Sequence, residues 1–390
     1  MSVEVEAYSE IPQKELIQEI LDYIFQPGSC SVASHRRVDG NRGYVSKVVA
    51  VELVWKDGLQ TDETKTPSKL VLKLPTTSRF KEDFTGKDGM GALIEGVETM
   101  LIEVHNIECK SYSFFRRVTA KIGFRPFAPQ CFGLREITSG VQGFLALEDW
   151  SHGTVPDFIN GLSLEQAKAV LDGVARLQVA GMLDDSWKEL AVQPLSERFH
   201  GFVKSKDFNH ETMLRDYPTV YKVSNDMVDL IYDVDHIVAS LNPKDPAIQV
   251  LTHGDLWPYN MLFKKSDNGK ASNEMLGFVD WQVAHAGLPG EDLSRFIVYS
   301  LQPDVRRNNE RDLLQHYYTA VQQYMPKDRT VPFTFDQVES HYRETMRHAA
   351  LWIHMTPSFM ENFKEATPEQ CKGLAWRAAC AVEDAYKCTR

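Results

Sequence analysis

Strand-like and helix-like segments are distributed unevenly along this 390-residue chain, and that imbalance constrains its fold more than any other feature. Short apolar runs typical of β-strands crowd the first 150 residues, whereas patterns with helical spacing fill most of the remainder. Because a single hydrophobic core usually stops growing below this length, two units are expected. The sequence therefore predicts an α+β protein with a sheet-rich N-terminal lobe over residues 1–147 and a mainly helical C-terminal lobe over 148–390.

The expected elements follow this division. The polar, glycine-containing stretch 79–93 is expected to be mobile. In the N-terminal lobe we expect a helix within 12–25, a β-rich run within 38–55, a short buried strand over 69–75, a helical pattern over 94–118 and two strands within 127–150. In the C-terminal lobe, helical patterns cover 163–182, 196–241, 307–325, 334–360 and 367–388, and two short strands cover 247–253 and 274–281.

Composition narrows the classes of function. The formal net charge is −11, with 54 acidic against 43 basic residues, which argues against a general nucleic-acid surface or an anionic-membrane surface. The six cysteines form no CxxC pair, so free thiols in a reducing compartment are expected and a zinc site is not. The acidic start MSVEVEAYSE has no apolar signal region, and no apolar run reaches eighteen residues. A cytoplasmic protein without a membrane partner is expected.

Three polar residues stand at the ends of the two short C-terminal strands. One strand leads into HGDLWPYN, which carries Asp255 and Asn260, and the other ends in VDWQ, which carries Asp280. Magnesium prefers oxygen ligands, and phosphoryl transfer needs a carboxylate that orients and deprotonates the attacking hydroxyl. We therefore predict Asp255 as the catalytic base and Asn260 with Asp280 as metal ligands. Each residue alone is also a common turn residue.

A phosphotransferase also needs a cation on the nucleotide phosphates, and Lys73 in KLVLKLP is the candidate. Strand alternation puts it on the opposite face from the leucines of this run. A lysine in a buried strand needs a partner, and Glu108 on the 94–118 helix is preferred over Glu103 and Glu98. The alternative is a lysine on an edge strand that points into water.

The stretch DGNRGYVSK (39–47) is a candidate loop over the phosphates of a nucleotide. Backbone amides at Gly43 and Tyr44 would face the phosphates, with the Ser46 hydroxyl beside them. The full G-x-G-x-x-G pattern is absent, and a plain hairpin turn explains the stretch equally well.

In chain order these parts resemble the kinase-like superfamily, in its choline and aminoglycoside kinase branch. The sequence is most similar to the CHK-kinase-like (ecdysteroid-kinase-like) family. The stretches that carry the resemblance are HNIECKSY, FLALEDWS, LTHGDLWPYNMLF and FVDWQVAHAGLPGEDLSRF, and the resemblance extends over roughly residues 35 to 385.

The resemblance implies a two-lobed protein-kinase-like fold with ATP and Mg²⁺ as cofactors. It places the adenine on backbone groups of the linker formed by Glu148, Asp149 and Trp150. It also assigns Asp292 to support of the catalytic loop, although an N-cap for LSRFIVYSL explains the same residue. For His253 it favours a structural role, as a residue that hydrogen-bonds the catalytic loop, over direct chemistry.

Two departures from protein kinases favour a small-molecule acceptor. Gly254 stands where protein kinases carry an arginine that reads a phosphorylated activation loop, and only twelve positions separate Asp280 from Asp292. A steroid alcohol, an amino alcohol and a sugar conjugate all remain open as acceptors. One departure from close relatives is Gln178, where a histidine is often found.

Several residues near these motifs have two interpretations. Trp257, Tyr259 and Trp281 could box a quaternary ammonium group, or they could be core packing. His285 could touch the substrate, or it could be a satisfied turn histidine. The predicted activity is an ATP- and Mg²⁺-dependent phosphotransferase that acts on a small-molecule hydroxyl. The alternative is a pseudokinase-like module that binds a nucleotide or another ligand without turnover. A metal hydrolase built on the same histidines and aspartates lacks a tight ligand spacing.

Overall fold

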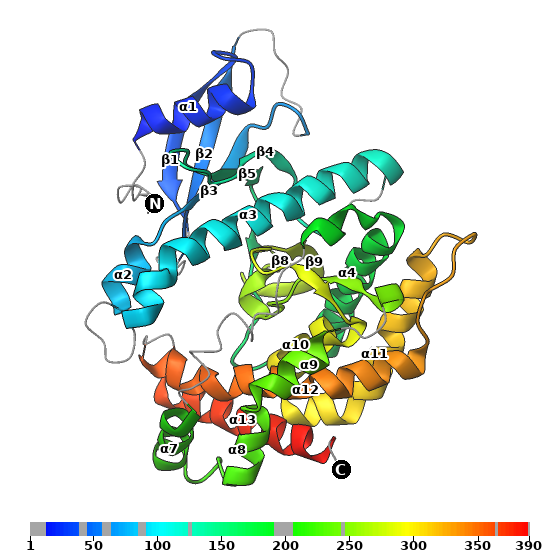
Figure 1. Cartoon of the computed structure of the whole chain (residues 1–390). Coiled ribbons are helices and arrows are strands. Elements are labelled where there is room, and N and C mark those ends of the chain that lie inside the picture. The colour runs from blue at the N-terminus through cyan, green and yellow to red at the C-terminus, as the bar shows by residue number, and fades with distance from the viewer. Residues whose placement is uncertain are drawn as a thin grey trace. The chain divides into compact units, whose positions relative to one another are not determined.

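The structure is a computed structural model that describes residues 13–38, 45–56, 64–84, 91–123, 127–190, 206–242, 246–362 and 366–388. The chain divides into two compact units. Unit 1 comprises Met1–Gly123 and Ala128–His152, and unit 2 comprises Phe124–Phe127 and Gly153–Arg390. Unit 1 contains a sheet and unit 2 is mostly helical, which confirms the predicted α+β class (Figure 1).

A five-stranded antiparallel sheet forms the centre of unit 1, in the order β1-β2-β3-β5-β4. Its strands are β1 (Cys30–Arg37), β2 (Ser46–Trp55), β3 (Lys69–Pro75), β4 (Cys131–Arg135) and β5 (Phe144–Glu148). Strand β1 is not among the predicted elements, because only two of its side chains, Cys30 and Val32, are buried and apolar. It pairs with β2 from Cys30 to Arg37, with one register shift between Val32 and Ser34.

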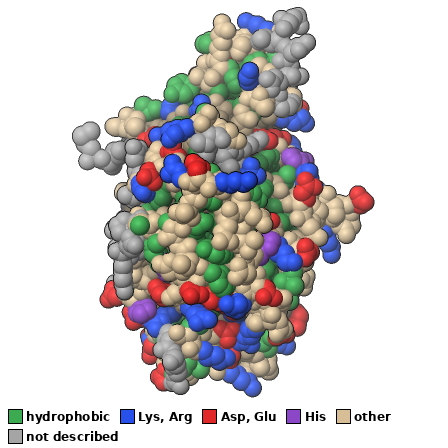
Figure 2. Space-filling view, turned by 90° about the vertical axis from the view of Figure 1, so that its right-hand side faces the viewer, with side chains coloured by type: hydrophobic (Ala, Val, Ile, Leu, Met, Phe, Trp, Pro, Cys, Tyr) green, Lys and Arg blue, Asp and Glu red, His purple; other side chains and the backbone are tan. Residues whose placement is uncertain are grey.

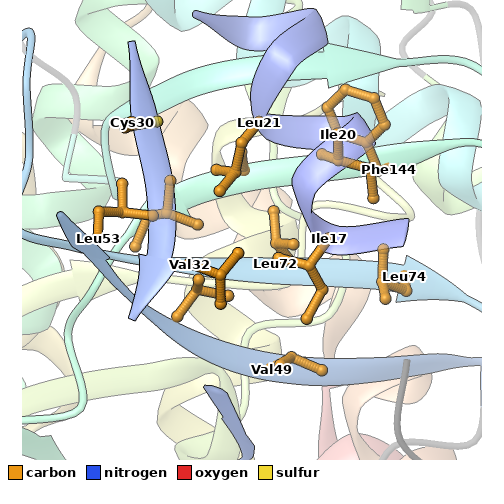
Figure 3. Close-up of a cluster of buried hydrophobic side chains, with 13 residues drawn as sticks. Ile17, Ile20, Leu21, Cys30, Val32, Val49, Leu53, Leu72, Leu74 and Phe144 are labelled. Atoms are coloured by element: carbon orange, nitrogen blue, oxygen red, sulfur yellow. The ribbon is translucent and has the colours of Figure 1, made fainter. Parts of the chain in front are cut away.

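Helix α1 (Lys14–Ile24) covers one face of this sheet. Figure 3 shows Ile17 and Leu21 of α1 near Leu72 and Leu74 of β3, within one cluster of buried apolar side chains. Burying these side chains removes apolar surface from water, at about 25 cal/mol per Å². The leucines of β3 therefore face α1, and the alternate residues of the same strand face the other side of the sheet.

Two further helices complete unit 1. Helix α3 (Gly91–Ile122) is longer than the predicted 94–118, and α2 (Ser78–Phe84) occupies part of the stretch for which the sequence predicts mobility. Within 79–93, residues 79–84 belong to α2 and residues 91–93 to α3, and Lys81 of α2 forms an ion pair of 2.5 Å with Glu98 of α3. The polar composition of the segment therefore reflects pairing between helices.

Unit 2 contains two small groups of strands among its helices. Strand β7 (Val250–Thr252) pairs with β10 (His285–Gly287), and a three-stranded antiparallel sheet has the order β6-β8-β9. Its strands are β6 (Gly153–Thr154), β8 (Met261–Lys265) and β9 (Ala271–Phe278). The sequence predicts only β7 and β9, because β8 has just two buried side chains and β6 and β10 are very short.

The helices of unit 2 agree with the predicted patterns except over 196–241 and at α10 (Pro289–Ser300), which lies in none of the predicted helical ranges. Over 196–241 the described residues form three short helices, α7 (Lys206–Asp216), α8 (Asn225–Ile231) and α9 (Val234–Leu241), because Pro218 and the Asp233 cap interrupt the run. The other helices are α4 (Leu164–Leu183), α11 (Pro303–Tyr324), α12 (Phe335–Asn362) and α13 (Pro368–Lys387), and short 3₁₀ turns cover Asp185–Leu190, Pro246–Ile248 and Pro258–Asn260.

Two features of the composition can be located in the structure, the charged side chains and the cysteines. On the face that Figure 2 shows, acidic and basic side chains are interspersed. All six cysteines are free thiols, and five of them are buried. Within the described part of the chain, no helix combines the length and the apolar character that crossing a membrane requires.

Candidate active site

Lys73 and Glu108 form the most buried lysine–carboxylate ion pair of unit 1 among the described residues. Lys73 Nζ donates to Glu108 Oε2 at 2.6 Å, with the two side chains 13% and 2% exposed. This is the pairing that the sequence favours, and Glu98 pairs with Lys81 instead. Strand β3 lies at the centre of the sheet, so the alternative of an edge-strand lysine is wrong. The pair fixes a cation on the face of the sheet that is opposite α1.

The structure describes only some of the residues that are expected to contact a nucleotide in unit 1. Ser46 is buried at the first position of β2, whereas Gly43 and Tyr44 lie outside the described residues. Glu148 ends β5, and its Oε2 accepts a hydrogen bond of 3.0 Å from the Gln130 backbone N–H. Asp149 and Trp150 follow it and are half-buried. Asp149 Oδ1 accepts from the Ser151 N–H at 2.7 Å, which fixes the turn after the sheet.

In unit 2, the loop after β7 carries His253, Gly254 and Asp255. Asp292 of α10 holds this loop, because its two carboxylate oxygens accept from the His253 N–H at 2.8 Å and the Gly254 N–H at 3.0 Å. Asp292 is fully buried, and burial raises the pKa of its carboxyl group, although His253 and the two backbone N–H groups counteract that rise. The N-cap interpretation of Asp292 is wrong, since α10 begins at Pro289 and its cap is Leu288.

Gly254 has a steric reason to be glycine. Its φ is +80°, and a Cβ atom there would lie 2.6 Å from the Val283 carbonyl oxygen and 3.0 Å from the His285 ring. A side chain would therefore need both a left-handed backbone and a displaced neighbour. The lack of space around Gly254 therefore excludes an arginine in this backbone conformation.

His253 is buried and has both ring nitrogens engaged. Its Nδ1 accepts from the Asp255 N–H at 3.3 Å, and its Nε2 lies 3.0 Å from the Val279 carbonyl oxygen. The first contact needs a bare Nδ1 and the second needs a protonated Nε2, so a single neutral tautomer satisfies both. His253 thus ties the Asp255 loop to the residue that precedes Asp280.

Asp255 is held by two donors and remains 20% exposed. Asn260 Nδ2 donates to Asp255 Oδ2 at 3.2 Å and to its carbonyl oxygen at 2.9 Å. Arg295 Nη2, from α10, donates to Asp255 Oδ1 at 2.9 Å. The carboxylate is therefore fixed at both oxygens while part of it faces solvent, which suits a group that must orient a substrate hydroxyl.

Asn260 and Asp280 lie at one end of the β8–β9 hairpin. Met261 pairs with Phe278, and the Val279 N–H donates to the Asn260 carbonyl oxygen at 3.0 Å. Asp280 is the one non-glycine residue with a positive φ, 69°, in the part of the chain that the structure describes. Such strain persists where the surrounding structure fixes it, often at functional sites.

The donor set of this hairpin end fits Mg²⁺. Asn260 uses its amide nitrogen on Asp255, which leaves the amide oxygen for a cation, and Asp280 supplies a carboxylate. One or two protein oxygens are usual for Mg²⁺ that also binds substrate phosphates and water. Among the described residues, no three His, Cys, Asp or Glu side chains gather to hold a metal, so the hydrolase alternative has no ligand set.

His285 is part of the buried support beneath the loop. Its Nε2 lies 3.0 Å from Glu291 Oε1, and both side chains are at most 1% exposed. Burial alone would lower the pKa of His285, but Glu291 and the hydrogen bond to Val283 raise it to about 9. The substrate-contact interpretation of His285 is wrong in this structure, because no part of the ring reaches the surface.

The predicted aromatic box does not form from its three members. Trp281 is fully buried and packs on His253 at 4.5 Å between ring centroids, whereas Trp257 and Tyr259 contact each other at 4.8 Å. Trp281 is therefore core packing, which is one of the two interpretations of that residue.

Gln178, the departure from the usual histidine, is buried and accepts a hydrogen bond from Tyr317.

Arg295 is the functional candidate that sequence reasoning missed. The signal that could have found it is the spacing Asp292-x-x-Arg295, which puts both side chains on one face of α10. Asp292 holds the backbone of residues 253 and 254, and Arg295 holds the side chain of Asp255.

Comparison with known proteins gives the fold and the family. A provisionally named aminoglycoside phosphotransferase from Ralstonia eutropha superposes with a TM-score of 0.50 at 14% identity, covering 96% of this chain and 98% of that chain. The chain therefore has the protein-kinase-like phosphotransferase fold, as the sequence predicts.

Two Caenorhabditis elegans proteins are similar in sequence. One, named "Uncharacterized oxidoreductase dhs-27", is 24% identical over 373 residues, which are 90% of this chain and 43% of that protein. The other, named "Uncharacterized kinase-like protein D1044.1", is 26% identical over 222 residues, which are 51% of this chain and 52% of that protein. The chain spans about half the length of these curated relatives. A family model matches residues 33–385, and the chain belongs to that family, DUF1679, described as "Uncharacterized oxidoreductase dhs-27".

Proposed function

We propose that this chain is an ATP- and Mg²⁺-dependent phosphotransferase that phosphorylates a hydroxyl of a small molecule. The observation that carries the proposal is the Asp255 carboxylate, which Asn260 and Arg295 fix at its two oxygens. It stands in a protein with the kinase-like fold. Within that fold, the stretches HNIECKSY, FLALEDWS, LTHGDLWPYNMLF and FVDWQVAHAGLPGEDLSRF favour the CHK-kinase-like (ecdysteroid-kinase-like) group.

Each residue then has a defined task. Asp255 orients the acceptor hydroxyl and takes its proton as the bond to phosphorus forms. Asn260 and Asp280 hold Mg²⁺, which when bound neutralises phosphate charge. Lys73 binds phosphate oxygens, and Glu108 keeps its side chain in place. Most of the rate gain comes from positioning and from charge neutralisation.

The name of the family raises an oxidoreductase as the competing activity. A nicotinamide-dependent dehydrogenase usually binds its cofactor on a parallel sheet with a G-x-G-x-x-G turn. This sequence has no G-x-G-x-x-G, and every strand pair in the described ranges is antiparallel. The relative that bears that name is more than twice as long as the matched segment, which is 43% of it. The site of this chain therefore favours phosphotransfer.

A small acceptor is favoured by the segment after Asp280. Helix α10 begins at Pro289, and β10 at 285–287 pairs with β7 in between. This compact connection holds no extended segment of the kind on which protein kinases dock a peptide. Steroid alcohols, amino alcohols and sugar conjugates remain the acceptor classes to be screened.

The test is a screen of a metabolite extract with the protein, ATP and Mg²⁺, in which mass spectrometry detects a phosphate mass gain. Wild type and Asp267→Ala, a change at an exposed position of the β8–β9 turn, should give the same product. Asp280→Ala should give none while keeping its melting temperature. A product that persists in Asp280→Ala would refute the mechanism.

A thermal-shift measurement with MgATP separates an enzyme from a module that only binds. Stabilisation by MgATP together with a phosphorylated product supports the phosphotransferase. Stabilisation without turnover on any fraction of the extract would favour the nucleotide-binding module instead.

A further inference from the structure

Arg295 has an unusual environment for a charged side chain. It is 5% exposed, and it forms an ion pair with Asp255. Its Nε and Nη1 atoms are buried and have no hydrogen-bond acceptor. A guanidinium carries five N–H donors, so leaving several unused in a protein interior is costly unless something else stabilises the charge.

Two aromatic rings supply that stabilisation. The guanidinium carbon lies 4.2 Å from the centroid of the Tyr299 ring, which is one turn further along α10, and 5.3 Å from that of Trp352 on α12. Cation–π contacts of this kind are stronger when the cation is removed from water. The rings hold the guanidinium in place, and its Nη2 atom donates to Asp255 Oδ1 at 2.9 Å.

His348, which contacts Trp352 of this stack, is neutral. Trp352 Nε1 donates to His348 Nε2 at 2.8 Å, and burial together with the charge of Arg295 lowers the pKa of His348 to about 3. His348 therefore accepts the indole N–H and adds no second positive charge beside Arg295. Among the described residues, Asp255 is the only carboxylate that forms an ion pair with this guanidinium.

We propose that Arg295 is a positioning residue, which holds the Asp255 carboxylate in the orientation that accepts the proton of the acceptor hydroxyl. This inference rests on the phosphotransferase function proposed above. Asn260 fixes one oxygen of Asp255 from the loop, and Arg295 fixes the other from α10. Neither contact alone prevents the carboxylate from rotating about its Cβ–Cγ bond.

The first experiment measures hydrolysis of MgATP, with water as the acceptor. Arg295→Gln should lower kcat by about 10- to 100-fold, as expected for loss of a supporting contact, with KM for MgATP unchanged within about twofold. Arg295→Lys should recover part of kcat, because an ammonium group restores the charge without the planar fork.

The matched control is Arg306→Gln. Arg306 is a similarly buried arginine, 2% exposed, that pairs with Asp384 between α11 and α13. Its loss should lower the melting temperature about as much as Arg295→Gln but leave kcat unchanged. A role of Arg295 in stability alone predicts that the two variants behave alike in both measurements, and that result would overturn the proposal.

Crystal structures of wild type and Arg295→Gln decide the point without any activity. Asp255 should turn in the variant and break its 3.2 Å contact with Asn260. An unchanged Asp255 together with unchanged kcat would refute the positioning role. Failure of wild type to bind or turn over MgATP would refute the proposed function, and the role of Arg295 in catalysis with it. Displacement of Asp255 in the variant would then show only that Arg295 holds this carboxylate in place.

Discussion

The cation of unit 1 and the carboxylate of unit 2 are held in place by different kinds of structure. Lys73 stands on a central strand and Glu108 on a long helix, so regular backbone positions both partners of the 2.6 Å pair. Asp255 stands on an irregular loop, and its position depends on side chains that lie about 40 residues later in the chain. Regular secondary structure sets the position of Lys73 in unit 1, and a few buried polar contacts set that of Asp255 in unit 2.

This difference predicts different weaknesses. A regular strand keeps its geometry when one side chain changes, because its ladder of backbone hydrogen bonds remains. An irregular loop that is anchored by Asp292 and Arg295 loses its geometry when an anchor changes, since few other bonds define it. Changes in the loop should therefore disturb both function and fold, whereas changes in the strand should separate the two.

The largest effect is expected from Asp255→Asn. The amide has nearly the same shape as the carboxylate but cannot take the proton of the acceptor, so turnover should fall by about 1,000-fold. The measurement is single-turnover transfer from MgATP under saturating nucleotide. Binding of MgATP, measured by calorimetry, should stay within about threefold of wild type. Turnover within about fivefold of wild type would exclude Asp255 as the base.

Lys73→Met is the corresponding change in unit 1. It should raise KM for MgATP and reduce turnover by about 100-fold, because one fixed charge on the phosphates is lost. It also leaves Glu108 buried without its cation, at a cost of about 3 kcal/mol in the free energy of unfolding.

The double variant Lys73→Met with Glu108→Leu separates these two effects. Removing both charges should restore most of the unfolding free energy, since two apolar side chains can replace a buried ion pair. Activity should stay as low as in Lys73→Met. Urea denaturation and steady-state kinetics on the same three proteins test this, and recovered activity in the double variant would contradict a role of Lys73 at the phosphates.

Lys73 and Asp255 also differ in how far the sequence predicts their surroundings. Alternation along KLVLKLP places Lys73 opposite Leu72 and Leu74, and these leucines do lie in the α1 core while Lys73 pairs with Glu108. A period of two along a strand is local information. The amino-acid order of one short strand is therefore enough to predict which face Lys73 occupies and that it needs an acidic partner.

For the Asp255 loop, the sequence predicts the motif but not its support. Arg295 reaches Asp255 across forty positions, and the spacing within α10 says nothing about which loop it will meet. Similarly, β8 and β10 are strands only because β9 and β7 lie beside them. The sequence leaves Trp281 as either core packing or part of an aromatic box, and only its tertiary packing on His253 decides for the core.

Gly254→Ala tests the dependence of the loop on its backbone conformation. The methyl group would meet the Val283 carbonyl oxygen at 2.6 Å at a φ of +80°, so the unfolding free energy should fall by about 3 kcal/mol and turnover should fall with it. Gly269→Ala is the matched control, because its φ is +78° and nothing lies within 4 Å. It should cost about 1 kcal/mol and leave turnover unchanged. Equal losses in both variants would mean that strain alone, without the clash, explains Gly254.

The smallest effect concerns acidification and compares one buried histidine in each unit. Burial lowers the pKa of His105 in unit 1 to about 4 and that of His354 in unit 2 to about 3, from 6.5. Because folding lowers these values, each neutral histidine stabilises the fold fully above pH 6.5, and that contribution declines as the pH falls.

His354 Nε2 lies 2.6 Å from the Tyr221 hydroxyl and its Nδ1 lies 3.1 Å from the Tyr232 hydroxyl, so His354→Gln keeps both a donor and an acceptor there without a titrating group. Wild type should lose about 2 kcal/mol more than His354→Gln between about pH 7 and pH 5, measured by urea unfolding. Hydrogen exchange should place the difference in α7, α8 and α12 and leave the sheet of unit 1 unchanged. An equal pH dependence of both proteins would mean that His354 does not have to stay neutral in the folded state, and that its partners reorganise to accept the charge.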